Sequence, residues 1–425
     1  MDSPSKKEYS KNGIIALCCM VYFVSYFSRK DFAAVMAGMI YDGAVSRANA
    51  GLIGTMLFAF YGAGQLISGY LGDKIKPKYL LLMGLSVTAL CNTLMPLIPD
   101  TAMIAAWGLN GLAQAMLWPP IVKILSTYLD HKTYVTANLL VTSAAHVATV
   151  LLYAYVPLCL SFMSWQTVFY TASALALCSI LIFAIAMRIV LPEEVENKVN
   201  TASTKTVGVD KIAEQKSDNI LTVLRKSGIF TVFVCIIVVG FLRDGIESWL
   251  PMLYSEAFGK DVSESTLVSM ILPIFSIISI TVVTALHRKG VLRNEVSGSV
   301  LLFAFALALA IPLVFFVTMD GAFFRVSALL LTAFICASMH GINFLLISCL
   351  PGRFAGIGRS ATVSGVCNSC VYIGAAISTY GIALLSEQKG WSITILSWCA
   401  IIAVGILFAF LSYKKYTEMI KKENE

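Results

Sequence analysis

The chain has 425 residues, of which 58% are hydrophobic and only 13% are charged, and its net charge is +7. About a quarter of the residues of an ordinary soluble domain are charged, so this composition excludes a soluble globular protein. The chain is predicted to be an all-α integral membrane protein embedded in the lipid bilayer, because helices of ~20 apolar residues can cross ~30 Å of hydrocarbon. The net positive charge is explained by Lys and Arg in the loops on one side of the membrane, so we expect no nucleic-acid partner.

Apolar segments of the required length follow one another along the whole chain. The polar lead before the first segment argues against a cleaved signal peptide, so we expect that segment to remain as an anchor. Twelve segments are predicted in the sequence, at residues 13–37, 49–72, 78–97, 101–125, 135–160, 165–190, 228–254, 264–286, 297–318, 325–350, 360–385 and 391–412.

One long polar stretch interrupts this series and has the composition of a flexible linker. The predicted domains are therefore an N-terminal six-helix half, a cytoplasmic linker and a C-terminal six-helix half, at residues 1–191, 192–226 and 227–425. A duplicated six-helix unit with a substrate site near the bilayer midplane, between the two units, is a known transporter architecture.

Positive charge is unevenly divided between the two sides of the predicted membrane. Most Lys and Arg residues fall in the connections on the side of the N-terminus, and the opposite connections hold only Arg47, Lys260, Arg325 and Lys389. Because cytoplasmic loops carry the excess of Lys and Arg, both termini are predicted to be cytoplasmic. We expect the cytoplasmic (inner) membrane of a bacterium as the location.

The first and seventh segments carry charges inside apolar sequence, where each costs ~2.5–3.5 kcal/mol on insertion scales. Tyr22, Tyr26 and Arg29 have the i, i+4, i+7 spacing of one helix face, which predicts that this face looks into the protein or a polar cavity. Arg243 occupies the matching place in the second half. A guanidinium presents a planar fork of donors that suits phosphate or carboxylate, so the two arginines could grip one anion between the halves.

A structural role for these arginines was the main alternative. Arg29 could pair with Asp31 or with an acid of another helix, and Arg243 with Glu247 or with another helix, while Asp244 adds a further acid. Lys30 could form either a gate salt bridge or a ligand contact. Further candidate substrate-binding residues, one or two per apolar segment, are Gln65, Trp118, His146, His340, Asn343 and Tyr372.

Several longer stretches resemble a known family. The runs "YFSRKDFAAVMAGM", "LNGLAQAMLWPPIVKILSTY", "SAAHV" and "FLRDGIESWLPMLYSEAFG" are similar to the organophosphate:inorganic phosphate antiporters of the major facilitator superfamily. This group holds bacterial glycerol-3-phosphate and hexose-6-phosphate transporters and the endoplasmic-reticulum glucose-6-phosphate transporter. The resemblance covers nearly the whole chain and implies a twelve-helix fold in two pseudo-symmetric halves.

The resemblance also implies roles for single residues. Arg29 and Arg243 match the two phosphate-binding arginines, and Lys30 matches a lysine implicated in salt bridging between the halves. The stretch "GYLGDKIKPK", which contains Asp73, resembles a loop motif of the superfamily, so Asp73 joins the expected gating or charge-pairing residues. Matches to pocket tyrosines and to the pocket histidine are Tyr22, Tyr26, Tyr372 and His146.

The chain departs from the family pattern at several of these places. Gln65 stands where the family often has a lysine, His340 stands in place of a tyrosine, and Asp244 and Glu247 add negative charge beside Arg243. A pocket with fewer cations and more acids suggests a different phosphate ester, or one that bears an amine or extra hydroxyls.

The sequence therefore predicts a secondary transporter that exchanges an organic phosphate ester, of the glycerol phosphate or sugar phosphate class, for inorganic phosphate by alternating access. A transporter-like membrane sensor of a phosphorylated metabolite and a transporter of carboxylates or other organic anions remain alternatives. An enzyme is not expected, because the chain shows no H-E-x-x-H, G-x-S-x-G or P-loop motif. We expect no cofactor or metal, and a monomer.

Overall fold

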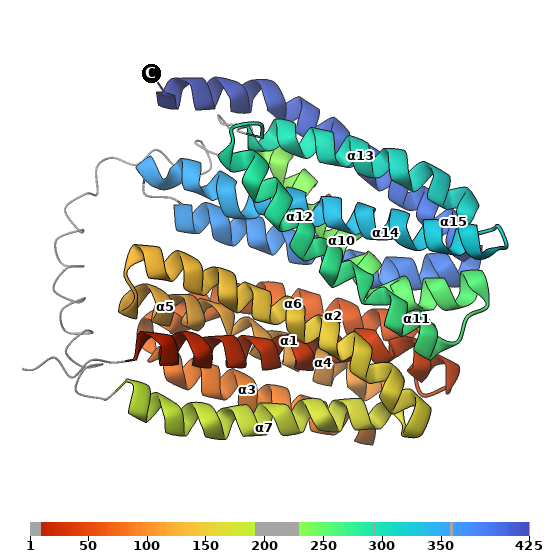
Figure 1. The fold of residues 1–425 in the computed structure, drawn as a ribbon, viewed down its shortest axis with the longest axis horizontal. Helices are drawn as coiled ribbons and strands as arrows, with labels where there is room; N and C mark the ends of the chain where they lie inside the picture. The colour runs from red at the N-terminus through yellow and green to blue at the C-terminus, as the bar shows by residue number, and fades with distance from the viewer. Residues whose placement is uncertain (1–9, 192–228, 293, 358–359, 425) are drawn as a thin grey trace, which may run out of the picture.

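The computed structural model describes residues 10–191, 229–292, 294–357 and 360–424, and these residues form helices with no strands among them. Figure 1 shows two groups of roughly parallel helices. The first group holds α1 (Lys11–Tyr41), α2 (Arg47–Lys74), α3 (Pro77–Leu94), α4 (Asp100–Ala115), α5 (Trp118–Tyr128), α6 (His131–Phe162) and α7 (Trp165–Val190). The second holds α10 (Ile229–Phe258), α11 (Val262–Ser269), α12 (Ile271–Arg288), α13 (Glu295–Phe316), α14 (Ala322–Asn343) and α15 (Ser360–Asn424).

The all-α membrane fold is confirmed. Nine helical stretches of the described chain are long and apolar enough to cross a membrane. The last of these, Val363–Glu418, contains 56 residues, and Gly390 breaks its helix with a φ of 77°, a conformation that glycine adopts without steric cost. The predicted segments 49–72 and 101–125 also form helices, as α2 and as α4 with α5. The count of twelve crossings stays a prediction, and the linker 192–226 lies outside the described residues.

Two predicted segments are each divided into two helices, and proline explains both divisions. Residues 101–125 form α4 and α5 instead of one helix, with Pro119 and Pro120 at the start of α5. Pro273 stands in the first turn of α12, which follows α11 after a break at Met270. A proline has no amide N–H to donate to the carbonyl four residues earlier, so a helix ends readily just before it.

Helices pack closest where glycine removes the side chain. A Cβ on Gly240 of α10 would collide with the backbone carbonyl of Val371 on α15, and a Cβ on Gly374 of α15 would collide with the carbonyl of Ile237 on α10. Gly111 of α4 meets the backbone of α2 in the same way. Because lipid tails give helices little hydrophobic reason to associate, close backbone packing of this kind is a main source of attraction in membranes.

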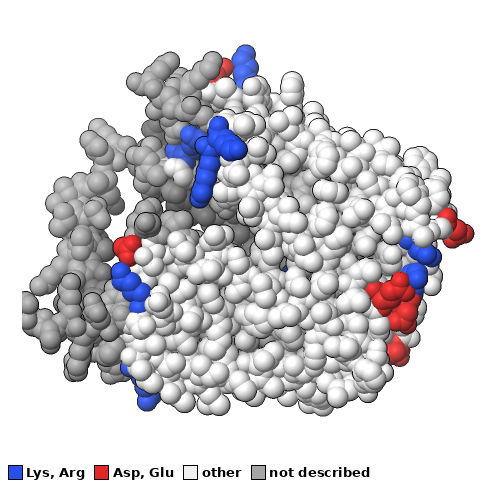
Figure 2. All heavy atoms as spheres, viewed as in Figure 1, with Lys and Arg blue, Asp and Glu red and all other residues white. Residues whose placement is uncertain are grey.

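The outer surface matches a bilayer environment. Large apolar side chains on α7, such as Leu181, Ile185 and Ile189, are more than half exposed. Figure 2 shows a broad uncharged belt over the helices, with Lys, Arg, Asp and Glu gathered at the two ends. Hydrocarbon can cover this belt without burying charge, as expected for a multi-pass membrane protein.

Candidate functional site

A cavity of about 1070 Å³ lies between the two helix groups. Residues of α1, α2, α6, α10, α12, α14 and α15 line it, so its wall draws on both halves of the sequence. A cavity of this size can enclose a small organic molecule, because ligand pockets commonly measure about 300–1,000 Å³.

The cavity is closed at one end of the helices by contacts between the two groups. Arg47 at the start of α2 forms an ion pair with Glu256 near the end of α10, and Trp391 Nε1 donates to the same carboxylate at 2.8 Å. The hydroxyls of Tyr41 and Ser255 lie 3.3 Å apart. These contacts lie at the end of the bundle opposite the N-terminus of α1 and the C-terminus of α15 (Figure 1).

Exposed side chains line the other end of the cavity. They come from α6 and from the last turns of α12, and they include Thr136, Leu139, Thr281 and Arg288. The cavity therefore opens on the side of the bundle where α1 begins and α15 ends.

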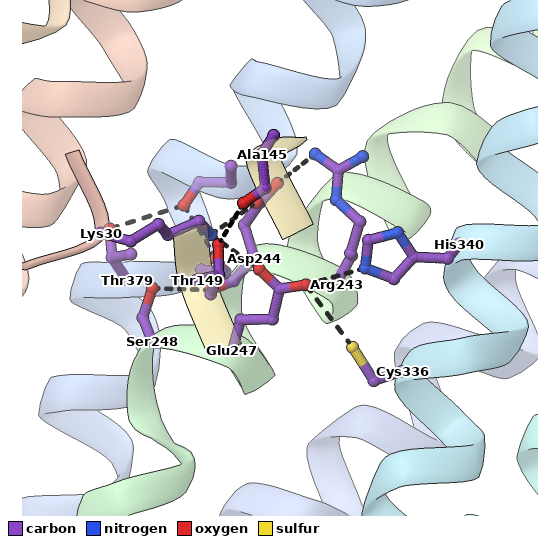
Figure 3. A network of polar contacts seen from close by, with 12 residues as sticks. Lys30, Ala145, Thr149, Arg243, Asp244, Glu247, Ser248, Cys336, His340 and Thr379 are labelled. Carbon is purple, nitrogen blue, oxygen red and sulfur yellow. Dashed lines mark hydrogen bonds and ion pairs between the residues drawn. The ribbon is translucent and has the colours of Figure 1, made fainter. Parts of the chain in front are cut away.

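A network of charged groups crosses the middle of the cavity (Figure 3). Lys30 Nζ of α1 lies 2.7 Å from Glu247 Oε2 and 3.7 Å from Asp244 Oδ1, both on α10. Arg243 Nη2 lies 2.6 Å from Asp244 Oδ2, and His340 Nε2 of α14 lies 2.7 Å from Glu247 Oε1. The network joins the first helix group to the second. It pairs Arg243 with Asp244, and not with Glu247 as the structural alternative supposed.

Arg29 stands next to this network but outside it. Its guanidinium carbon lies 4.2 Å from the centre of the Tyr26 ring and 4.9 Å from that of Tyr61. It is 7% exposed, its Nε has no hydrogen-bond partner, and no carboxylate of the described chain forms an ion pair with it. Aromatic faces stabilise a cation, but they leave the N–H donors of the guanidinium available to a ligand in the cavity.

Asp31 does not pair with Arg29, although that pairing was one expectation. It is fully buried, and the contact that the structure shows for its carboxylate is a 2.8 Å hydrogen bond from the amide N–H of Phe32. The expected gating or charge-pairing role of Asp31 is not seen. Two residues along a helix correspond to a turn of about 200°, so Asp31 points away from the face that carries Arg29.

Aromatic rings form the wall around Arg29. The ring centres of Tyr22 and Tyr26 are 5.0 Å apart, and those of Tyr22 and Trp118 are 4.8 Å apart. The ring centres of Tyr372 on α15 and Tyr61 on α2 are 4.4 Å apart, so both halves contribute to this wall. Tyr61 was missed in the sequence, where the candidate substrate-binding residue on this helix was Gln65, one turn further on.

Two histidine rings meet edge to face in the cavity wall. Their ring centres lie 6.2 Å apart. His146 Nδ1 lies 2.9 Å from the backbone carbonyl oxygen of Thr142 in the preceding turn. Asn343, one turn after His340 on α14, accepts a 2.8 Å hydrogen bond from Arg243 Nη1. The structure therefore places His146, His340 and Asn343 in the cavity wall, and their role in binding a substrate stays a prediction.

Some expected residues do not reach the cavity. Gln65 is on α2 but does not line it, and the side chain of Asp73 lies outside the described residues. Asn110 and Gln114, two further polar residues of the segment 101–125, hold α4 against α1: Gln114 Oε1 accepts from Ser25 Oγ at 2.5 Å, and Asn110 Nδ2 donates to the carbonyl of Ser28 at 3.2 Å.

Comparisons with known proteins agree with this architecture. Part of the chain, 106 residues or 25% of it, is 35% identical to a "Probable hexose phosphate transport protein" of Chlamydia pneumoniae, but this match covers only 23% of that protein. A longer match, 24% identical over 281 residues, covers 63% of the chain and 62% of the "Membrane sensor protein UhpC" of Escherichia coli (strain K12). The chain thus aligns with less than two thirds of the length of either relative.

A solved structure and a family model cover far more of the chain. The inward-facing, unoccupied crystal structure of "A Bacterial Homolog to Human Lysosomal Transporter, Spinster" matches 98% of this chain and 99% of its own chain, with a TM-score of 0.74 and 13% identity. At that identity the likeness concerns the fold alone. The Major Facilitator Superfamily model matches residues 18–379. The chain belongs to the major facilitator superfamily.

Proposed function

We propose that this protein exchanges an organic phosphate ester, of the sugar phosphate or glycerol phosphate class, for inorganic phosphate across the membrane. The observation that carries the proposal is the buried guanidinium of Arg29, which faces a cavity between the two halves and has no acid partner in the described chain. An arginine fork fits phosphate oxygens in a bidentate way. The name of one relative, a probable hexose phosphate transport protein, supports the same ligand class.

Arg243 is the second proposed phosphate ligand. Its Nη1 and Nη2 already hold Asn343 and Asp244, so a phosphate bound to Arg243 must share it with these groups or displace them. Lys30 links the halves through Glu247. Anion binding that draws Arg243 away from Asp244 would leave more of the Asp244 carboxylate for Lys30, so ligand binding and the contacts between the halves are coupled.

Alternating access follows from these charges. In the structure the open side of the cavity keeps water within reach of Arg29. Closing that side without an anion would bury the guanidinium unpaired, at a cost of several kcal/mol, whereas a bound phosphate gives it a partner of opposite charge. The carrier should therefore change sides quickly when it is loaded and slowly when it is empty, which selects exchange over net flow.

The proposed movement is a rocking of the two six-helix halves about the cavity. Both termini are proposed to be cytoplasmic, from the distribution of Lys and Arg. The open end of the cavity lies on the side of the termini, so with cytoplasmic termini this structure would be the inward-open state. Arg47 and Glu256 would then close the outer side.

Uptake of labelled phosphate into proteoliposomes tests this function. Vesicles preloaded with unlabelled phosphate should take up label, and vesicles without internal phosphate should take up little. The Arg29→Ala variant should lose this exchange. Rapid uptake into empty vesicles would contradict an exchange mechanism, and uptake by Arg29→Ala equal to wild type would remove Arg29 from the site.

A sensor is the second candidate, because the relative with the longer alignment is a membrane sensor protein. A sensor would bind phosphate esters in the same cavity without moving them. Saturable binding in detergent together with no uptake in vesicles, at equal protein recovery, would favour the sensor over the exchanger.

A further inference from the structure

We infer that the ester recognised by this cavity carries an ammonium group, as in a phosphorylated amino alcohol or amino sugar. The inference rests on the proposed phosphate-binding function and specifies its substrate class. It is carried by two independent features of the cavity, which are its charge count and the direction of the hydrogen bonds at its two histidines.

The charge count concerns the side chains at the middle of the cavity. Lys30 and Arg243 are matched by the carboxylates of Asp244 and Glu247 through the ion pairs already described. Arg29 has no such partner in the described chain, so this centre holds one positive charge in excess when both histidines are neutral. Arg288 and Lys289 also line the cavity, but they are exposed at its mouth, where water and salt screen them.

A phosphate monoester does not balance this centre by itself. Its phosphate carries a charge of about −1.5 to −2 at neutral pH, so binding it to Arg29 would turn the single positive charge into a net negative charge. Uncompensated charge is costly in an enclosed site of low dielectric. An ester that also bears an ammonium group has a net charge near −1 and brings the centre close to neutrality.

The histidines show where the ammonium would lie. The contact at His146 Nδ1 is to a backbone carbonyl, which only accepts hydrogen bonds, so Nδ1 carries the proton and Nε2 of the neutral ring is an acceptor. The Nε2 of His340 donates to the Glu247 carboxylate, which leaves Nδ1 of His340 as the acceptor. When both imidazoles are neutral, each has one acceptor nitrogen without a hydrogen-bond partner in the described chain, which suits an N–H or O–H donor and not a phosphate oxygen.

The cavity is thus polarised. Arg29 with Tyr26 and Tyr61 forms a pole of donors and positive charge. His146 and His340 form a pole of acceptors, and the carboxylate of Glu247 stands one hydrogen bond behind His340 (Figure 3). A hydroxyl could also donate to this second pole, but it would not correct the charge. The charge count therefore favours an ammonium over a hydroxyl at the same place.

Matched pairs of esters test the inference without any variant. Glucosamine 6-phosphate and glucose 6-phosphate differ by an ammonium against a hydroxyl, as do 2-aminoethyl phosphate and 2-hydroxyethyl phosphate. Each compound would compete with labelled phosphate in wild-type exchange. We expect the amine of each pair to inhibit at a concentration at least about tenfold lower, which corresponds to roughly 1.4 kcal/mol. Equal potency within both pairs, with clear inhibition by all four, would overturn the inference and leave phosphate transport intact.

The Glu247→Gln variant tests the charge count directly. Removing this carboxylate raises the excess positive charge to two, so the preference for the amine should fall by about tenfold and the dianionic esters should bind more tightly. Glu264→Gln, which removes an exposed acid outside the cavity, is the matched control and should keep the wild-type preference. An unchanged preference in folded Glu247→Gln would contradict the inference. If no ester and no phosphate competes in wild type, the proposed function itself fails, and the inference falls with it.

Discussion

The two arginines of the cavity occupy matching places in the two halves but differ in their surroundings. Arg29 lies against tyrosine rings and has no acid partner in the described chain. Arg243 is held by Asp244 and Asn343 at 2.6 and 2.8 Å. The comparison suggests a division of labour, in which Arg29 is ready for an anion and Arg243 is tied to the contacts between the halves. Four experiments can break or sharpen this comparison.

Removing Arg243 should have the largest effect, and it should act on stability as well as on transport. Arg243→Ala leaves the nearly buried carboxylate of Asp244 with Lys30 at 3.7 Å as its remaining ion-pair partner. Breaking one partner out of a buried ion pair costs about 3–5 kcal/mol. The expected result is a clear drop in melting temperature in detergent together with loss of exchange.

The double variant Arg243→Ala, Asp244→Ala is the control for this effect. It removes both charges, so the melting temperature should recover most of the loss while exchange stays absent. A melting temperature as low as that of the single variant would show that the pair with Asp244 is not the reason for the drop.

Removing Arg29 should affect binding much more than stability. Arg29→Ala takes away a cation that has no acid partner in the described structure, so the melting temperature should stay near that of wild type or rise. Phosphate affinity should fall by about 3 kcal/mol, which is roughly a hundredfold. Arg29→Lys keeps the charge but loses the planar fork, so its phosphate affinity should lie between those of wild type and Arg29→Ala. Similar stability losses in Arg29→Ala and Arg243→Ala would erase the contrast between the two sites.

A smaller effect is expected at the closed end of the cavity. Arg47→Ala removes the ion pair with Glu256 and the hydrogen bond to Ser386. Partly exposed pairs contribute about 1 kcal/mol or less, so the balance between the two open states should shift only several-fold. Spin labels at Ala44 and Glu387, in a background without the native cysteines, should show a larger population of long distances. Unchanged distances would mean that other contacts hold this end closed.

The smallest effect is expected at the exposed pair of Lys11 and Asp130, whose charged atoms lie 3.0 Å apart. Hydrogen bonds from Lys11 and Thr133 lower the pKa of Asp130. The stabilisation is therefore present above the unfolded pKa of about 3.9 and is lost as the pH falls through the lower folded pKa. Asp130→Asn keeps the helix cap, so exchange at pH 7 should be unchanged. A large loss of exchange in Asp130→Asn would contradict the expectation that transport depends on the buried charges and not on this exposed pair.

Helical spacing predicted a good part of the site. Tyr22, Tyr26 and Arg29 repeat every four or three residues, and the structure places all three on the cavity wall. The same rule would have excluded a pair between Arg29 and Asp31, which lie only two residues apart on the helix. The sequence could not predict that Arg243 pairs with Asp244 and not with Glu247, because this depends on the positions of Lys30 and His340 on other helices.

The position of a residue along the helix axis was the other limit, because residues one turn apart share a face. On α2 the sequence offers both Tyr61 and Gln65, and one turn of helix separates them. Only packing against α15 decides that Tyr61 meets Tyr372. The two prolines after Trp118 likewise indicate a helix break in this segment. The direction of the Trp118 ring, however, depends on its contacts with α1.

The reciprocal glycine contact between α10 and α15 has a mechanical consequence for the site. Gly240 and Gly374 each lie against the backbone of the opposite helix, and Arg243 and Tyr372 are within one helical turn of these glycines. This close packing keeps the backbones of α10 and α15 in a fixed relation, so the positions from which Arg243 and Tyr372 extend cannot move far relative to each other. The cavity wall of the second half is therefore expected to move as one rigid body. The closure around a ligand has to come from the approach of α1, which carries Arg29 toward Arg243.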